Sequence, residues 1–538
     1  MGSMEPIARD GNPVALPRLT HMALRLERDT PLCIIAFSVS YWLFTALHSM
    51  ARLWYDELKT FYISRLPSAD MIWTALKDGP DFNPPLLYWV TRIAQRFFGE
   101  SPMATRLPQM IGFWALCLCL FCFVSRRCGR LYGLCAMVFP VLTIAYGYAS
   151  NARAYGIVLG FCGIALVCWQ MATEKSKRSF WLLAYSLALA GALATHVYAC
   201  LLVIPFGMGE LARAWRTRKA DYPAWIATAL PLLSLAVYIP LIPAFRSFTM
   251  KGSIFRPDAS SISKCYTFLL GPAAWVLVAA LCIGISLSRY SAARNSQAED
   301  HPIGPRFHEI VCAVGLALVP VFGVLFALAT TGIFLERYGL AGVIGAGVLL
   351  VSFVGWSSHY SPIAAACVFL LFGGWFLWTS GVWACEAVSG YTPSSRLPAL
   401  ELSQLRSDLP IVLSSGLMFL EADHYESKDV LSRTYYLLNR PAALAYTGTD
   451  VFEQDFQRAR RWFPLRGQLV NYDTFRAAHS TFLVFGPYAY ANDWLIRKLA
   501  DDGSTFVLKG EYRGPYGDCV LLEVTCPRPP LKADAHKH

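Results

Sequence analysis

Apolar stretches close to 20 residues long recur along the first 385 residues, and they constrain the fold more than any other feature. A helix needs about 20 apolar residues to cross a hydrocarbon core roughly 30 Å thick. The chain of 538 residues is 55% hydrophobic and only 15% charged, whereas soluble domains carry about 25% charged residues. The sequence therefore predicts a polytopic α-helical membrane protein rather than a large soluble one.

We predict eleven membrane-spanning helices. Their approximate bounds are 31–50, 104–125, 131–149, 154–173, 180–195, 197–212, 223–245, 266–288, 308–331, 338–357 and 361–384. Residues 1–30 form a predicted cytoplasmic tail, whose first three residues, before Met4, resemble a vector remnant and are set aside. The first apolar run follows this polar, Arg-containing tail, so we interpret it as a spanning helix and not as a cleavable signal peptide.

The net charge of +11 lies entirely in residues 1–389 and follows the predicted topology. Basic residues gather in alternate connections: Arg18, Arg25 and Arg28; Arg126, Arg127 and Arg130; Lys175, Lys177 and Arg178; Arg213, Arg216, Arg218 and Lys219; Arg289, Arg294 and Arg306. The positive-inside rule makes this side cytoplasmic. Topology therefore accounts for the charge without nucleic-acid binding, and the 51–103 loop, the 246–265 loop and the C-terminal region become extracytoplasmic.

A second domain is predicted at 390–538, after a membrane domain at 31–385. From Leu397 the composition changes to strand-like runs that alternate with a helix near 490–500. This alternation predicts a small extracytoplasmic α/β domain. Cys519 and Cys526 lie within it. They could pair in an oxidising compartment, and two unpaired thiols fit the sequence equally well.

The first extracytoplasmic loop, 51–103, carries two acidic motifs. Asp56-Glu57 directly follows the first span, and Asp81 and Asn83 precede two prolines and the next apolar run. A carboxylate can take the proton of an acceptor hydroxyl or amine, and prolines would hold Asp81 and Asn83 in a fixed pose. The simpler alternatives are a solvated loop acid and an ordinary start of a helix. Amphipathic spacing in the loop predicts helices lying in the membrane interface.

Further polar residues occupy other connections on this side. Arg153, in the 149–153 turn, could bind phosphate oxygens or snorkel to lipid headgroups. Glu336-Arg337 is a charged pair at membrane depth, which is typical of a functional site. His196 borders an apolar face, where a packing role is the simpler interpretation. The 246–265 loop adds four cations, including Lys251 and Arg256, that suit a lipid phosphate or acidic headgroups in general.

Together these pieces resemble one family. They are Asp56-Glu57, Asn83-Pro84-Pro85-Leu86, Phe98-Gly99, Arg106-Leu107-Pro108, Arg153-Ala154-Tyr155, Thr195-His196-Val197-Tyr198 and Glu336-Arg337-Tyr338. The chain resembles GT-C glycosyltransferases, which take sugar from a polyprenyl phosphate. It most resembles the bacterial branch of the lipid A aminoarabinose transferase and the lipopolysaccharide-core galacturonosyltransferases, and more distantly protein O-mannosyltransferases. The match is good over about 50–215, weaker through 216–385, and architectural only beyond.

The resemblance implies an inverting transferase of the bacterial inner membrane, with its active site and C-terminal domain on the periplasmic side. The implied catalytic residues are Asp56 and Glu57; charge and sidedness suggest donor-phosphate binding by Arg153, Arg337, Lys251 and Arg256, and a substrate cavity with Asp81, Asn83, Asn151, Tyr155, His196 and Glu336. Relatives often have an acidic residue and a proline where this chain has Asn151 and Ala154. Aminoarabinose transferases have Glu-Lys-Pro at Phe82-Asn83-Pro84, so the sugar stays open.

The expected partners are an undecaprenyl-phosphate-linked sugar, membrane lipids, and an envelope glycan, lipid or protein as acceptor, with no nucleic acid. No cofactor is required, although a divalent cation bridging Asp56 and the donor phosphate is compatible with the sequence. A lipid-linked sugar flippase and a non-catalytic lipid-binding protein are the alternatives. Carboxylates at helix ends on one side favour an enzyme, and the lack of an internal sequence repeat weakens a transporter.

Overall fold

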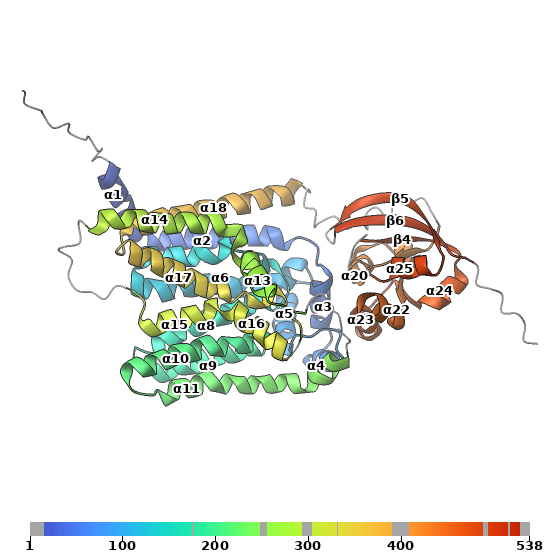
Figure 1. Cartoon of the computed structure of the whole chain (residues 1–538), viewed down its shortest axis with the longest axis horizontal. Helices are drawn as coiled ribbons and strands as arrows, with labels where there is room; N and C mark the ends of the chain where they lie inside the picture. The colour runs from blue at the N-terminus through green and yellow to red at the C-terminus, as the bar shows by residue number, and fades with distance from the viewer. Residues whose placement is uncertain are drawn as a thin grey trace, which may run out of the picture.

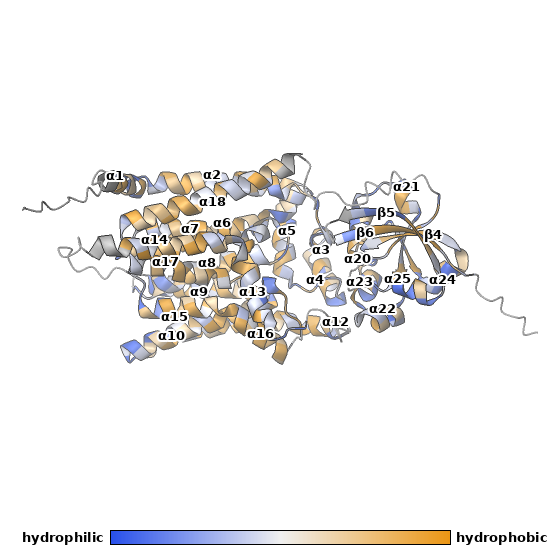
Figure 2. Cartoon of the chain, turned by 45° about the horizontal axis from the view of Figure 1, so that its top comes forward, coloured by the Kyte–Doolittle hydropathy of each residue, from blue (hydrophilic) through white to orange (hydrophobic). Residues whose placement is uncertain are grey.

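The chain forms a bundle of long helices followed by a small α/β domain (Figure 1). The computed structural model describes residues 15–174, 177–247, 256–292, 304–330, 332–389, 408–487, 493–514 and 517–527. Hydrophobic residues dominate the bundle, while the α/β domain carries many hydrophilic residues on its helices (Figure 2). The predicted two-part architecture is therefore present, and the predicted boundary near residue 390 lies outside the described residues.

The bundle is built from fifteen α-helices among the described residues. They are α1 Ala15–Arg28, α2 Thr30–Ser49, α6 Pro102–Cys128, α7 Arg130–Val138, α8 Tyr155–Ala172, α9 Arg178–Leu193, α10 Val203–Thr217, α11 Tyr222–Ala229, α12 Ile242–Ser247, α13 Ser260–Leu270, α14 Ala274–Ala292, α15 Phe307–Ala317, α16 Val319–Ala329, α17 Gly342–Ser357 and α18 Pro362–Ser389. Short 3-10 segments join them: η1 Phe139–Leu142, η2 Ile144–Ser150, η3 Val197–Leu202, η4 Leu230–Leu241, η5 Gly271–Ala273 and η6 Glu336–Gly339.

Seven helices in the described part are long and apolar enough to cross a membrane. The number rises to nine if two helix pairs, bent by 75° and 51°, each form one broken span. Pro140 and Pro320 lie near these breaks, as expected for a residue that interrupts helical hydrogen bonding. The other two predicted spans fall on α9 and α17, which are apolar but only 16 residues long. The multi-pass helical fold is confirmed, and the count of eleven stays a prediction.

Ion pairs bring the predicted basic connections together at one end of the bundle. Arg127 pairs with Glu309 at 2.9 Å and with Glu174 at 3.3 Å. Arg178, at the start of α9, likewise pairs with Asp221, in the connection between α10 and α11. This clustering agrees with the alternation of basic connections along the sequence. Which end faces the cytoplasm remains a prediction.

Three short helices of the 51–103 loop lie between the bundle and the α/β domain (Figures 1 and 2). They are α3 Tyr55–Ser64, α4 Ala69–Asp78 and α5 Pro85–Phe98. Ser68 caps α4 by accepting the Met71 N–H at 3.1 Å. Helix α5 exposes Ile93, Phe97 and Phe98, a pattern that suits a helix lying in a membrane interface.

The α/β domain contains a six-stranded sheet in the order β3-β2-β1-β4-β6-β5. Strands β1 Ile411–Leu413, β2 Thr434–Leu438, β3 Gln468–Asn471 and β4 Thr481–Pro487 are parallel, while β6 Gly517–Thr525 runs antiparallel to β4 and to β5 Thr505–Gly514. The helices are α20 Gly416–Tyr425, α21 Lys428–Ser432, α22 Arg440–Thr447, α23 Val451–Ala459, α24 Tyr472–Ala478 and α25 Leu495–Asp501. The predicted α/β class of this domain is confirmed.

The two cysteines of this domain are both free thiols. Cys519 lies in β6 and Cys526 follows its last residue, Thr525. Seven residues of extended chain separate their Cα atoms by roughly 23 Å at about 3.3 Å per residue, whereas a disulfide needs less than about 7 Å. The alternative of a Cys519–Cys526 disulfide is therefore wrong.

One hydrophobic core continues from the 51–103 loop into the α/β domain. Leu58, Tyr62 and Leu76 belong to the same buried cluster as Phe419 and Phe456. The structure thus joins the predicted α/β domain to the helices that follow the first span. This joint core determines how the helix bearing Asp56 is supported.

Helices α6 and α8 pack closely because of small residues. A Cβ at Gly160 would lie 2.5 Å from the carbonyl oxygen of Gly112. Gly156 and Gly160 have the spacing of a small-residue motif that lets membrane helices approach. We expect Gly160→Ala to lower the free energy of unfolding by about 1–3 kcal/mol, the usual effect of overpacking, measured by denaturation in detergent.

Gly373→Ala in α18 is the matched control, because a Cβ there meets no atom within 4 Å. Equal losses of stability in the two variants would contradict the role of Gly160 in close packing.

Candidate active site

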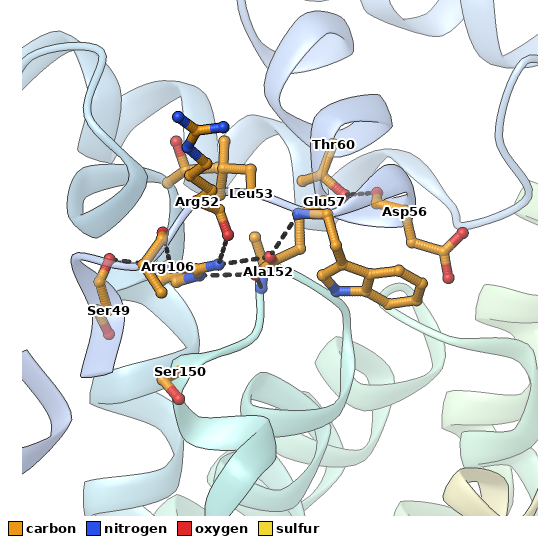
Figure 3. Close-up of polar contacts among 12 residues, drawn as sticks. Ser49, Arg52, Leu53, Asp56, Glu57, Thr60, Arg106, Ser150 and Ala152 are labelled. Carbon is orange, nitrogen blue, oxygen red and sulfur yellow. Dashed lines mark hydrogen bonds and ion pairs between the residues drawn. The ribbon is translucent and has the colours of Figure 1, made fainter. Parts of the chain in front are cut away.

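Arg106 of α6 holds the turn between α2 and α3 (Figure 3). Its Nε donates to Glu57 Oε1 at 2.7 Å and its Nη2 to Glu57 Oε2 at 2.5 Å. The remaining N–H groups donate to the carbonyl oxygens of Ser49, Ala51 and Arg52 at 2.9, 2.7 and 3.0 Å. A guanidinium has five N–H donors, so Arg106 is fully hydrogen-bonded.

Glu57 is equally enclosed. Beyond Arg106, its carboxylate accepts the backbone N–H of Ala152 at 2.6 Å and that of Trp54 at 3.3 Å. The residue is 0% exposed. With its oxygens occupied and no access to solvent, Glu57 ties the start of α3 to the 149–153 turn. The geometry therefore gives Glu57 a supporting position instead of the predicted catalytic one.

Asp56 points away from this ion pair (Figure 3). Its carboxylate lies 3.6 Å from Nη2 of Arg337, and its side chain is 20% exposed. Asp56 occupies the first turn of α3, where the unpaired N–H groups of a helix N-terminus favour negative charge. The structure thus separates the two adjacent carboxylates, and only Asp56 is accessible.

Arg337 lines a pocket with a volume of about 240 Å³. The lining residues are Trp54, Ile144, Gly147, Tyr148, Asn151, Arg153, Tyr155, Phe268 and Arg337. Within this wall, Arg337 Nε and Asn151 Oδ1 are buried without a hydrogen-bond partner in the described part of the chain. Buried polar groups are normally satisfied. Two unsatisfied ones in an aromatic-lined pocket indicate a binding site for a polar ligand.

Asp81 holds Arg153 in a two-pronged ion pair. The Arg153 Nη1 and Nη2 atoms lie 2.6 and 3.1 Å from the two carboxylate oxygens, and the Tyr88 hydroxyl donates to Asp81 at 2.7 Å. Burial by itself would raise the pKa of Asp81, but the Arg153 charge outweighs it and holds the pKa below its usual value. Asn83 is buried beside Tyr88. Arg153 is therefore already neutralised, while Arg337 has the weaker carboxylate contact.

His196 lies among aromatic rings rather than in the pocket wall. Its ring centroid is 5.4 Å from that of Tyr155 and 5.2 Å from that of Tyr338. Burial, together with the charges of Arg153 and Arg337, lowers the pKa of His196 to about 3. Such a weak base is neutral near pH 7, so the arrangement fits the packing interpretation.

The structure brings two of the four predicted phosphate-binding cations together, Arg153 and Arg337. Arg256 is exposed and is absent from the pocket lining, and Lys251 lies outside the described residues. Glu336 is half-buried next to Arg337. The described residues hold no group of three potential metal ligands, so a divalent cation at Asp56 remains a prediction that would need substrate oxygens as ligands.

The sequence analysis did not assign a role to several residues of the pocket and its support. Trp54 and Tyr148 adjoin the Asp56 and Arg153 motifs, so their position in the chain was an available signal. Phe268 reaches the pocket from α13, and nothing in its local sequence marks it. Arg106 belonged to a family motif but had no assigned role.

A comparison with solved structures finds a match over nearly the whole chain. The crystal structure of ArnT from Cupriavidus metallidurans bound to undecaprenyl phosphate aligns with a TM-score of 0.53 and 13% sequence identity, covering 91% of this chain and 97% of that chain. This chain has the ArnT fold. The fold implied by the sequence resemblance is therefore confirmed.

A second structure, ArnT from the same organism in the apo state, aligns with a TM-score of 0.46 and 14% identity over the same shares of the two chains. No protein-family model and no curated protein sequence matches this chain. The ArnT fold thus rests on the shape of the molecule, and the roles of its residues rest on the geometry described above.

We expect Glu57→Gln to destabilise the protein strongly. The change leaves the buried Arg106 charge unbalanced, and breaking a buried ion pair in this way typically costs about 3–5 kcal/mol. Denaturation in detergent measures the effect. Asp56→Asn is the control. The native Asp56 carboxylate is partly exposed and makes one longer ion pair, so this variant should lose far less stability than Glu57→Gln. Equal losses would contradict the anchoring role of Glu57.

The Asp81–Arg153 pair predicts a pH-dependent contribution to stability. Because the pKa of Asp81 is lowered in the folded state, the pair stabilises the protein above the ordinary Asp pKa of about 3.9. This contribution is lost as pH falls through the lower folded-state pKa. We expect Asp81→Asn to be less stable than the native protein at pH 7, with the difference shrinking below about pH 4. Thermal unfolding across this pH range measures it, and a constant difference would contradict the assignment.

Proposed function

We propose that this protein is an integral-membrane glycosyltransferase that moves a sugar from an undecaprenyl phosphate donor to an acceptor outside the cytoplasm. The observation that carries the proposal is the facing pair of Asp56 and Arg337 beside an unsatisfied polar pocket. The ArnT fold supports it, because the matched ArnT structure contains undecaprenyl phosphate. The sidedness of the reaction follows from the predicted topology.

Asp56 acts as the base in this proposal. Its carboxylate takes the proton from the acceptor hydroxyl or amine as the acceptor oxygen or nitrogen bonds to the anomeric carbon. The bond from that carbon to the phosphate oxygen breaks, and undecaprenyl phosphate leaves with the bonding electrons. Attack opposite the leaving phosphate inverts the anomeric centre.

Arg337 neutralises the phosphate as it leaves. Its side chain lines the pocket and is 29% exposed, so a phosphate oxygen can accept a charge-assisted hydrogen bond from its guanidinium. Arg153, whose charge Asp81 already neutralises, keeps the pocket wall fixed. Stabilising the developing charge with preorganised groups is commonly the largest contribution to catalysis.

The aromatic wall provides the rest of the site. Trp54, Tyr148 and Tyr155 offer ring faces and hydroxyl groups around the pocket, and Asn151 adds a polar side chain to its lining. Pockets of this kind bind a ligand by shape and fix its orientation through a few polar groups. We therefore assign the sugar to this pocket, next to Asp56.

We expect Asp56→Asn to abolish transfer and to leave lipid binding intact. Losing a general base lowers turnover by about a hundredfold to ten-thousandfold. Purified protein is incubated with a panel of undecaprenyl-phosphate sugars and candidate envelope acceptors, and the released undecaprenyl phosphate and the glycosylated product are measured. Asp70→Asn, an exposed carboxylate in the same loop, is the matched control and should keep full activity.

The other outcomes separate the alternatives. Near-normal turnover by Asp56→Asn would rule out the catalytic assignment. Release of undecaprenyl phosphate without a glycosylated product would indicate hydrolysis. Movement of the intact donor across a vesicle membrane without release would indicate a flippase, and binding alone would indicate a non-catalytic lipid-binding protein.

A further inference from the structure

Asp56 lies between two residues that are anchored to different parts of the molecule. Glu57 is fixed to the bundle through Arg106. Tyr55 is fixed to the α/β domain, because its hydroxyl donates to the carboxylate of Asp455 in α23. The backbone N–H of Tyr55 also donates to an oxygen of Glu421 in α20, at 3.2 Å.

Lys59, one turn further along α3, binds the same Asp455 carboxylate. The side chains of Lys59 and Asp455 are 7% and 3% exposed, and the Lys59 Nζ lies 4.7 Å from the centre of the Tyr55 ring. Two charges at this depth carry a large desolvation penalty, so a buried pair is weak evidence for added stability. Its better-attested effect is to fix one register between packed elements.

The contacts of α3 are sorted by helical face. Tyr55, Lys59 and Tyr62 have the spacing i, i+4 and i+7, which places them on one face. All three contact the α/β domain. Tyr55 and Lys59 bind Asp455, and the Tyr62 hydroxyl lies 2.7 Å from Nδ1 of His424. Asp56 and Thr60 share the adjacent face, where Arg153 lies close to both. The rotation of α3 about its axis therefore determines where the Asp56 carboxylate points.

Helix α3 cannot set this rotation alone. It has only ten residues, and isolated helices shorter than about 12–15 residues are marginal in water. A buried ion pair restricts the rotation of a helix about its axis, whereas apolar contacts tolerate small rotations of the helix. Asp455 binds two α3 side chains of the same face, Tyr55 and Lys59.

We propose that Asp455 is a positioning residue for Asp56. Through Tyr55 and Lys59, it sets the rotation of α3 and so directs the Asp56 carboxylate toward Arg337 and the pocket. The inference rests on the proposed function, because it takes Asp56 as the catalytic carboxylate. It gives the α/β domain a direct part in turnover.

The test uses the full chain with two kinds of change. Asp455→Asn removes the charge and keeps the shape. The triple variant Tyr55→Phe, Lys59→Met and Asp455→Leu removes the whole polar set without leaving a buried charge, which such networks often tolerate. Arg461→Ala is the matched control, because it breaks a different contact of the α/β domain with the loop, the 3.1 Å ion pair with Asp78.

In both Asp455 variants we expect kcat to fall by about tenfold to a hundredfold, the effect of misplacing a catalytic group by roughly 1 Å. KM and the affinity for undecaprenyl phosphate should stay near the native values, and Arg461→Ala should keep the native kcat. The rates are normalised to the concentration of folded protein that binds undecaprenyl phosphate. A native kcat in the triple variant, or an equal loss in Arg461→Ala, would overturn the proposal.

Hydrogen–deuterium exchange of α3 provides a readout that needs no turnover. We expect faster exchange over residues 55–64 in the Asp455 variants and native exchange in Arg461→Ala. Unchanged exchange in the Asp455 variants would also overturn the proposal. The two hypotheses fail differently: an active Asp56→Asn contradicts the proposed function, whereas an inactive Asp56→Asn with fully active Asp455 variants contradicts only the positioning role.

Discussion

The buried ion pair between Arg106 and Glu57 is the interaction on which the arrangement of this site depends. It joins the end of α2, the start of α3, helix α6 and, through Ala152, the 149–153 turn. A buried pair is stabilising only when its remaining donors and acceptors are also satisfied. Because every N–H of Arg106 has a partner, three regions of the chain, residues 49–57, helix α6 and the 149–153 turn, meet in one geometry, and the pocket is built on them.

This pair also explains how two adjacent carboxylates acquire different roles. Consecutive residues of a helix point about 100° apart, so Asp56 cannot share the site of Glu57 and lies on the side of α3 that faces Arg337. The catalytic prediction favoured Asp56 and included Glu57 beside it, but the sequence alone showed no physical difference between the two carboxylates. Their environments separate them, since Glu57 is 0% exposed and Asp56 remains accessible.

The membrane helices, the alternation of basic connections and the α/β class could be predicted because length, hydropathy and charge are properties of short segments. The sequence marked Arg153 at its turn as a candidate, but its partner Asp81 lies 72 residues away and was not foreseen. The contact of Tyr55 with Asp455 spans 400 residues. Phe268 likewise comes to the pocket only through tertiary packing. Such long-range contacts leave no periodic or compositional signal, so the structure alone reveals them.

The α/β domain therefore does more than cover a cavity. A cover needs only surface contacts, whereas this domain inserts two carboxylates, Asp455 and Glu421, against the first turns of α3 and shares a hydrophobic core with the loop. Helix α3 has one face on the bundle, one on the α/β domain and one toward the pocket. A shift of the α/β domain relative to α3 must then either break the Lys59–Asp455 pair or move α3 with it, so the packing couples the position of this domain to the helix that carries Asp56.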